Sequence, residues 1–202
     1  NRQATIIVDI ETTPESIHDW DALGHAVGSR LPAHAVPVLA GNFNRPNAIQ
    51  LKSFFASLAC AAGTELCHII GLTPEAPLLE RGLGKRNRLE RLAITAEAAA
   101  ATIDTLNPHE RRKIDYISLG CPHYHIDEIR RIAAYLNGKR IHPDTVVHIW
   151  TAGSIKYQAD RCGYTDVIEK AGAKILTGSC PSSRGYPDGV HAAAYDSAKQ
   201  RM

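Results

Sequence analysis

The sequence predicts an α/β protein built from layered α/β/α lobes with mainly parallel sheets. Short apolar segments alternate with amphipathic helical ones along most of the chain, the pattern of parallel strands joined by helices. Ile114–Leu119 is a short apolar run, typical of a strand covered on both faces. Two such strands, Ile114–Leu119 and Ala173–Thr177, are each followed by a glycine and a Cys-Pro pair.

The first lobe is expected over residues 1–76, as part of a domain that begins upstream. Its order is strand, helix, strand, helix, strand, with the strands at Ala4–Ile10, Val36–Gly41 and Leu66–Gly71. Trp20, Leu23, Val27 and Leu31 mark the first helix by their spacing. The second helix spans Leu51 to Ala62 and ends at Gly63, a residue suited to a helix C-terminus.

Residues 77–90 are rich in Gly, Arg and Lys and are expected to be a linker. The second lobe is expected over residues 91–202 and begins with an Ala-rich helix, Leu92–Leu106. Its later elements alternate in type, with strands at Ile114–Leu119, Val146–Trp150 and Ala173–Thr177 and helices at Ile126–Leu136, Ile155–Arg161 and Thr165–Lys170. From Ser182 we expect a loop, and from His191 a helix.

Composition limits the class of protein. The 202 residues carry a formal charge of +2, which implies neither a nucleic acid nor an anionic membrane as partner. No stretch reaches the roughly 20 apolar residues of a membrane span, and no secretory signal is visible. Five scattered cysteines indicate a reducing, cytoplasmic location rather than a disulfide framework. The chain begins at Asn1 without an initiator Met, so we expect a fragment or a processed chain.

Cys121 and Cys180 are the first candidate functional residues. Each cysteine follows a strand, at the edge where open α/β sheets bind ligands. A helix begins just after Cys121, and the dipole of that helix favours the thiolate form of the cysteine. Two thiolates in equivalent positions suggest the ligation of an iron–sulfur cluster. The alternatives are two buried, inert thiols, or a zinc site that would also use His123 and His125.

Polar residues at other strand ends are further candidates. Thr73 and Glu75 lie in a loop suited to binding an anion or moving a proton, although Thr73-Pro74-Glu75 is also a good helix start. His68, within an apolar strand, fits a buried structural residue as well as a ligand-binding one. Ser197 and Lys199 would look like a solvated tail if taken alone.

At these residues the chain resembles the C-terminal half of the large (catalytic) part of the aconitase X family, a branch of the aconitase superfamily. The resemblance covers nearly the whole sequence in order and spacing. Four segments carry it: Leu72-Thr73-Pro74-Glu75-Ala76, Ser118-Leu119-Gly120-Cys121-Pro122-His123, Ser179-Cys180-Pro181 and Ser197-Ala198-Lys199.

The resemblance implies dehydration of a small hydroxy acid, cis-3-hydroxy-L-proline first and phosphorylated mevalonate next. It implies a 2Fe–2S or 4Fe–4S cluster held by Cys121, Cys180 and a third cysteine on the missing N-terminal half. A small swivelling β-rich subunit or domain would close the site. By the same resemblance Ser197, Lys199 and His123 are expected to be catalytic. Thr73, Glu75 and His68 are expected to bind substrate.

Two residues depart from the family pattern. His125 stands where a capping Ser is usual, so only Glu128 of a capping box remains. Asp196 stands where Asn is usual, and a carboxylate there would repel an anionic substrate if it faced the site. The competing hypothesis is therefore a non-catalytic, cluster-free binding or assembly module. A nucleotide-binding domain ranks last because neither G-x-G-x-x-G nor a P-loop is present.

Overall fold

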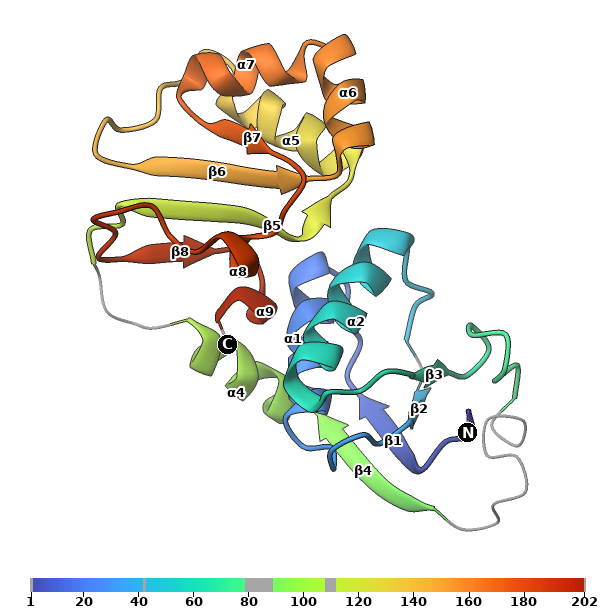
Figure 1. Ribbon diagram of the computed structural model, residues 1–202. Coiled ribbons are helices and arrows are strands. Elements are labelled where there is room, and N and C mark those ends of the chain that lie inside the picture. The colour runs from blue at the N-terminus through green and yellow to red at the C-terminus, as the bar shows by residue number, and fades with distance from the viewer. Residues whose placement is uncertain (1, 42, 79–88, 108–111, 202) are drawn as a thin grey trace. The chain divides into compact units, whose positions relative to one another are not determined.

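The structure is a computed structural model that describes residues 2–41, 43–78, 89–107 and 112–201. The chain divides into two units, Asn1–Pro108 and His109–Arg201. Each unit has one four-stranded sheet and a core of its own (Figure 1). None of the helices in the described ranges has the length and apolar character needed to cross a membrane.

The sheet of the first unit has the order β3-β2-β1-β4, and every neighbouring pair is parallel. Its strands are β1 (Ile6–Glu11), β2 (Pro37–Gly41), β3 (His68–Ile69) and β4 (Glu90–Thr95). The expected parallel α/β fold is thereby confirmed. The third strand is shorter than its apolar run suggests, because only His68 and Ile69 pair with β2.

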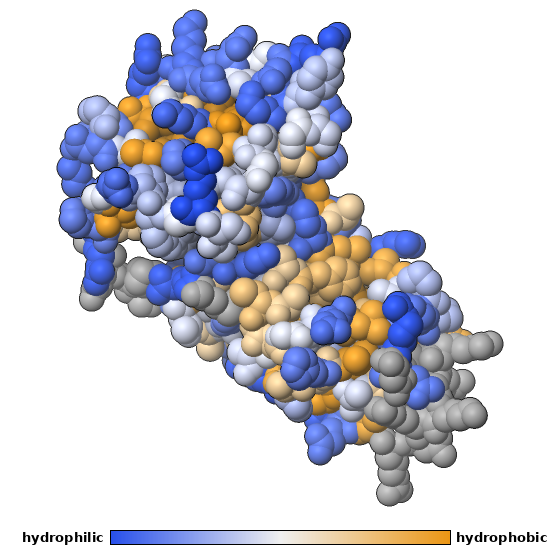
Figure 2. All heavy atoms as spheres, viewed as in Figure 1, coloured by the Kyte–Doolittle hydropathy of each residue, from blue (hydrophilic) through white to orange (hydrophobic). Residues whose placement is uncertain are grey.

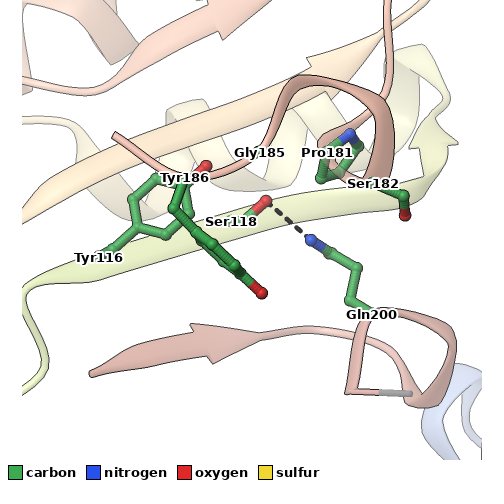
Figure 3. Close-up of a pocket in the computed structure, with 7 residues that line it drawn as sticks. All are labelled: Tyr116, Ser118, Pro181, Ser182, Gly185, Tyr186 and Gln200. Atoms are coloured by element: carbon green, nitrogen blue, oxygen red, sulfur yellow. Dashed lines mark hydrogen bonds between the residues drawn. The ribbon is translucent and has the colours of Figure 1, made fainter. Parts of the chain in front are cut away.

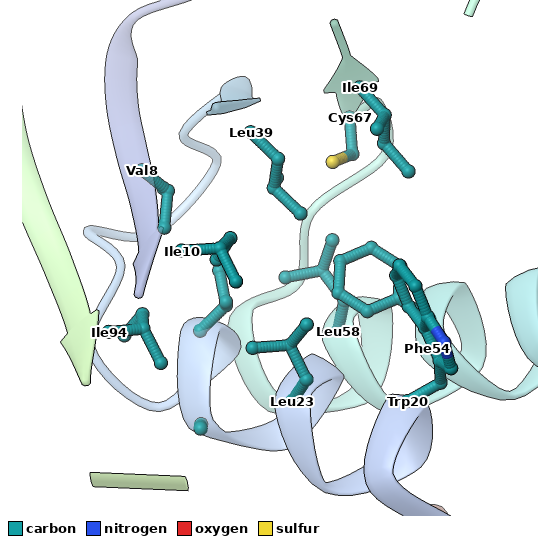
Figure 4. Close-up of a cluster of buried hydrophobic side chains, with 12 residues drawn as sticks. Val8, Ile10, Trp20, Leu23, Leu39, Phe54, Leu58, Cys67, Ile69 and Ile94 are labelled. Carbon is teal, nitrogen blue, oxygen red and sulfur yellow. The ribbon is translucent and has the colours of Figure 1, made fainter. Parts of the chain in front are cut away.

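Two long helices cover one face of this sheet, α1 (Ile17–Gly28) and α2 (Ala48–Ala62). Each begins with a reciprocal capping box, Ser16 with Asp19 and Asn47 with Gln50. The two helices approach closely at Gly24, where a Cβ atom would overlap the Phe54 carbonyl oxygen. Their apolar stripes meet the sheet in one buried cluster (Figure 4), which includes Val8, Trp20, Leu23, Leu39, Phe54, Leu58, Ile69 and Ile94.

The boundary between the units differs from the expected one. Glu90–Thr95 pairs with β1 as β4, and only then does α4 (Ala96–Leu106) begin. An assignment of residues 91–107 to the second lobe, with a helix from Leu92, is therefore wrong. Ile94 is buried in the first core, and this packing overrides the helical preference of the segment. The expected linker 77–90 falls mostly on residues 79–88, which lie outside the described residues.

The second unit repeats the same topology with the strand order β7-β6-β5-β8, again entirely parallel. Its strands are β5 (Tyr116–Tyr124), β6 (Val146–Thr151), β7 (Lys174–Leu176) and β8 (Ala193–Tyr195). Parallel strands place all their carboxyl ends at one edge of the sheet, so the segments that follow β5, β7 and β8 converge there.

One face of this sheet packs against three helices, α5 (Ile126–Leu136), α6 (Gly153–Arg161) and α7 (Tyr164–Ala171). Their buried residues, among them Ile129, Ala159 and Ile168, meet Ile149 and Ile175 of the sheet. The outer surface over α6 and α7 is mostly polar in Figure 2, as expected for helices with one buried side.

The opposite face of the second sheet carries Tyr116 and Ser118, which alternate with the inward Ile117 and Leu119. Two short helices, α8 (Pro181–Arg184) and α9 (Ala198–Arg201), lie on this side (Figure 1). The expected helix from His191 is wrong, because residues 193–195 form β8 instead. Pairing with β5 gives this Ala-Ala-Tyr segment partners that outweigh its helical propensity.

Candidate active site at the carboxyl edge of the second sheet

Cys121 lies in a sharp bend of β5. Gly120 has φ +92°, and a Cβ atom there would meet the backbone of Trp150, with its nitrogen at 3.1 Å and its carbonyl carbon at 3.2 Å. Only glycine combines this conformation with so close an approach. The Cys121–Pro122 peptide bond is cis, and Cys121 is 4% exposed. The thiol is therefore buried within the bend of β5.

Asp196 anchors this bend from the other side. It follows β8, and both of its carboxylate oxygens accept from the backbone N–H of Gly120, at 3.1 and 3.3 Å. Its side chain is also hydrogen-bonded to Tyr124. Burial raises the pKa of Asp196, while the bonds from Tyr124 and Gly120 work in the opposite direction. The residue thus joins the loop after β8 to the Gly120-Cys121 bend.

Cys180 follows β7 in a second turn, with Gly178 at φ +74°. The segment is tied to the Cys121 bend because Nε2–H of His123 donates to the Ser179 carbonyl at 2.8 Å. The Cys180 Sγ lies 3.0 Å from the Ser183 Oγ. Hydrogen bonds from the hydroxyl and backbone of Ser183 lower the pKa of the Cys180 thiol, and the charge of Lys199 adds to this effect.

Ser197 and Lys199 reach the same edge on the segment after β8. The Ser197 hydroxyl is buried and finds no hydrogen-bond partner among the described residues. Lys199 is two residues further along this segment, and its positive charge contributes to the lowered pKa of the Cys180 thiol. Five predicted site residues therefore gather on three strand ends of one unit, and we call them the cysteine edge: Cys121, His123, Cys180, Ser197 and Lys199.

The three predicted residues of the first unit lie around the end of β3. Thr73 forms no helix start, because residues 71–75 are turns and its hydroxyl both accepts from the Ile69 N–H and donates to the Ile69 carbonyl. Glu75 accepts from Arg2 at 2.7 Å. His68 is 1% exposed, its Nε2 lies 2.7 Å from the Arg2 carbonyl, and its Nδ1 lies 4.0 Å from the Glu75 carboxylate.

Sequence reasoning missed a polar pair beside the cysteine edge. Gln200 donates to the Ser118 Oγ at 2.9 Å, and both residues line a cavity under α8 (Figure 3). Ser118 also accepts from the Trp150 indole N–H at 3.2 Å. The one signal in the sequence is Ser118 itself, a hydroxyl within an apolar strand. Gln200 lies 82 positions away and gives no sign of the contact.

The donor set bears on which metal could bind. All five cysteines lie within the described ranges, and none forms a disulfide. Among the described residues no group of three or more His, Cys, Asp or Glu side chains is arranged to hold a metal ion. Two of these thiols, Cys121 and Cys180, belong to the cysteine edge.

Sequence profiles of one family match nearly the whole chain. The aconitase X second domain matches residues 4–104 and the aconitase X third domain residues 114–202. Both matches agree with the division of the structure into two units.

Curated relatives and a solved structure agree with these matches. The cis-3-hydroxy-L-proline dehydratase of Hypocrea jecorina is 31% identical over 93% of this chain and 32% of its own length. The phosphomevalonate dehydratase large subunit of Methanothermobacter thermautotrophicus is 34% identical over 98% of this chain and 48% of its own length. Aconitase X of Thermococcus kodakaraensis, in its holo form, matches the whole chain at 27% identity and a TM-score of 0.82, and half of that chain is covered.

The chain thus spans between a third and a half of the length of these relatives. Fold, domain order and sequence lead to one assignment: the chain belongs to the aconitase X family, in which it corresponds to the second and third domains.

Proposed function

We propose that the chain is part of an iron–sulfur hydro-lyase that removes water from a small hydroxy acid. The preferred substrate is cis-3-hydroxy-L-proline, and the second is mevalonate 5-phosphate, the substrate classes named for its relatives. The complete enzyme would include an N-terminal half and a small swivelling β-rich subunit or domain. The single observation that carries the proposal is the cysteine edge, which brings two thiols and three polar side chains to the carboxyl edge of one sheet.

The thiols of this edge fit a cluster that takes its remaining ligand from another segment. Thiolates are the ligands of iron–sulfur clusters, and the hydrogen bonds from Ser183 favour the thiolate form of Cys180. Cys121 is fixed by the Gly120 bend, and the bond between His123 and Ser179 joins the two cysteine segments. When bound through three thiolates, such a cluster supplies a Lewis acid with an open coordination position that polarises the departing hydroxyl group.

The other residues of the edge supply charge and proton transfer. Elimination breaks a C–O bond and a C–H bond next to a carboxylate, so negative charge develops on that carboxylate. The ammonium group of Lys199 is suited to hold it. The Ser197 hydroxyl, buried and without a partner in the described part of the chain, is our candidate to take the proton. For this step the Ser197 oxygen must be ionised, and the positive charge of Lys199 would favour the alkoxide if it lies close by.

His123, which the resemblance predicts to be catalytic, has a positioning role in this proposal instead. Its Nε2–H is donated to the Ser179 carbonyl and fixes the tautomer of the ring. In the first unit, Thr73, Glu75 and His68 are proposed to bind substrate. The exposed Arg2–Glu75 pair would then exchange partners when an anion arrives.

The test is turnover by the complete protein with its small subunit, reconstituted anaerobically with iron and sulfide. Loss of one water from cis-3-hydroxy-L-proline and from mevalonate 5-phosphate is followed by mass spectrometry. Cys121→Ala and Cys180→Ala are expected to abolish turnover. Cys162→Ala, at an exposed thiol at the end of α6, is the matched control and should keep full activity.

Two results would contradict the proposal. The first is full turnover by the Cys121→Ala or Cys180→Ala protein. The second is saturable binding of small hydroxy acids with no turnover by the reconstituted wild-type assembly, which is the behaviour of a non-catalytic binding module.

A further inference from the structure

A cavity of about 270 Å³, part of it open to solvent, lies between β5, α8 and α9 in the second unit. Its walls include Tyr116, Ser118, Pro181, Tyr186 and Gln200 (Figure 3). Much of this volume is open to solvent, so the enclosed part has room for one small group of a ligand rather than for a whole molecule. The cavity adjoins the cysteine edge on two sides, since Pro181 follows Cys180 and Gln200 follows Lys199.

The polar groups of this cavity are incompletely paired. Ser118 Oγ accepts from two N–H groups, those of Trp150 and Gln200, which leaves its own hydroxyl proton without an acceptor among the described residues. The Gln200 Oε1 is buried and likewise has no partner there. Exchanging the amide oxygen and nitrogen of Gln200 would satisfy Ser118 but leave the amide N–H group unpaired. In either orientation a buried polar atom needs a partner from outside the described chain.

The walls determine which ligand chemistry fits. No Lys, Arg, Asp or Glu is among the residues that line the cavity. The Tyr116 and Tyr186 rings lie edge to face, with centroids 6.0 Å apart, and both hydroxyl groups are already engaged, with His148 and Tyr195. A phosphate or carboxylate would lose hydration here and find no Lys or Arg side chain among the lining residues. A neutral or cationic group that carries N–H or O–H could bond to Gln200 and lie against the aromatic rings.

We infer that Gln200 and Ser118 form a substrate subsite that binds the N–H-bearing, non-anionic end of the hydroxy acid. The inference builds on the proposed dehydratase function and assigns a specificity role to two residues. The anionic end of the same molecule extends toward Lys199. A substrate with an anionic group at both ends has no partner for the second charge in this cavity, so the subsite selects against it.

The first test is steady-state kinetics of the complete assembly. Gln200→Leu keeps the approximate size of the side chain but removes the amide, and KM for cis-3-hydroxy-L-proline should rise roughly tenfold, the effect of losing one hydrogen bond to a neutral group. Because Gln200 contacts the non-reacting end, kcat should change much less than KM. Gln158→Leu, at an exposed position of α6, is the matched control and should change neither constant.

The second test detects binding without turnover. The Trp150 indole N–H donates to Ser118, so its NMR signal reports on the cavity, while Trp20, buried in the first unit, is the internal reference. In the assembly with 15N-labelled tryptophan, and with the signal assigned by Trp150→Phe, cis-3-hydroxy-L-proline should shift the Trp150 signal saturably. Inorganic phosphate should not. Gln200→Leu should weaken the response to the amino acid.

The two failures can be told apart. An unchanged KM in a folded Gln200→Leu enzyme, or a Trp150 signal that ignores the amino acid while turnover proceeds, overturns the subsite and leaves the dehydratase proposal standing. A saturable Trp150 response that depends on Gln200, in an assembly without turnover, supports the subsite and overturns the dehydratase. A response to inorganic phosphate alone also overturns the subsite.

Discussion

Replacing Gly120 by alanine tests how the Cys121 bend is held. At φ +92° an L-residue is strained, and the left-handed conformation costs a non-glycine residue about 1–2 kcal/mol. The new Cβ would also meet three backbone atoms of Trp150, with the nitrogen at 3.1 Å and the carbonyl oxygen nearer still. Backbone atoms of a central strand cannot move aside easily, so overpacking adds about 1–3 kcal/mol. We expect Gly120→Ala to lower the free energy of unfolding by about 2–5 kcal/mol in total.

The matched control is Gly138→Ala. Gly138 has φ +73° and lies in the same unit, but nothing stands within 4 Å of its would-be Cβ atom. Gly138→Ala should therefore lower the free energy of unfolding only by the conformational contribution, about 1–2 kcal/mol. Urea unfolding of the chain, followed by circular dichroism and tryptophan fluorescence, gives both values. Equal losses for the two variants would refute the argument that Trp150 closes the space beside Gly120.

Three further predictions concern neighbouring residues. Burial raises the pKa of Asp196, so the folded chain loses stability as the pH rises from the ordinary carboxyl pKa through the raised one. Asp196→Asn should remove that loss in unfolding curves measured from acidic to neutral pH. An unchanged pH slope would contradict this prediction. Ser183→Ala should slow alkylation of Cys180 by iodoacetamide at neutral pH, because it removes the hydroxyl hydrogen bond that is the main cause of the lowered thiol pKa. An unaltered rate would exclude that cause. His125→Ser should stabilise the chain by about 1 kcal/mol in thermal unfolding, since His125 makes no side-chain cap hydrogen bond; a lower melting temperature would rule this out.

The sequence was most informative where local pattern and topology agree. Apolar segments followed by glycine correctly predicted β5 and β7 as parallel strands, and Cys180 follows β7 as expected. The strand at Cys121 is longer than expected, because β5 bends at Gly120 and continues to Tyr124. The half-kept capping box was also predictable, since Glu128 alone accepts the His125 N–H, at 2.8 Å. Both features depend on residues only a few positions apart.

The misses arose where distant contacts decide the structure. β4 and β8 are Ala-containing segments whose strand form depends on pairing with β1 and β5. The contact between the Asp196 carboxylate and the Gly120 N–H joins residues 76 positions apart, and nothing in the sequence indicated it. Gln200 gave no signal at all. The roles of His68, Thr73 and Glu75 in substrate binding stay predictions.

The most direct test of the account is the iron content of the complete assembly after anaerobic reconstitution, read together with its visible absorption. Wild type and Cys162→Ala should bind iron and sulfide and absorb in the visible, because Cys162 lies at the end of α6 and outside the cysteine edge. Cys121→Ala and Cys180→Ala should each lose most of the iron and the colour while remaining folded by circular dichroism. Undiminished iron and colour in both of these variants would contradict the account.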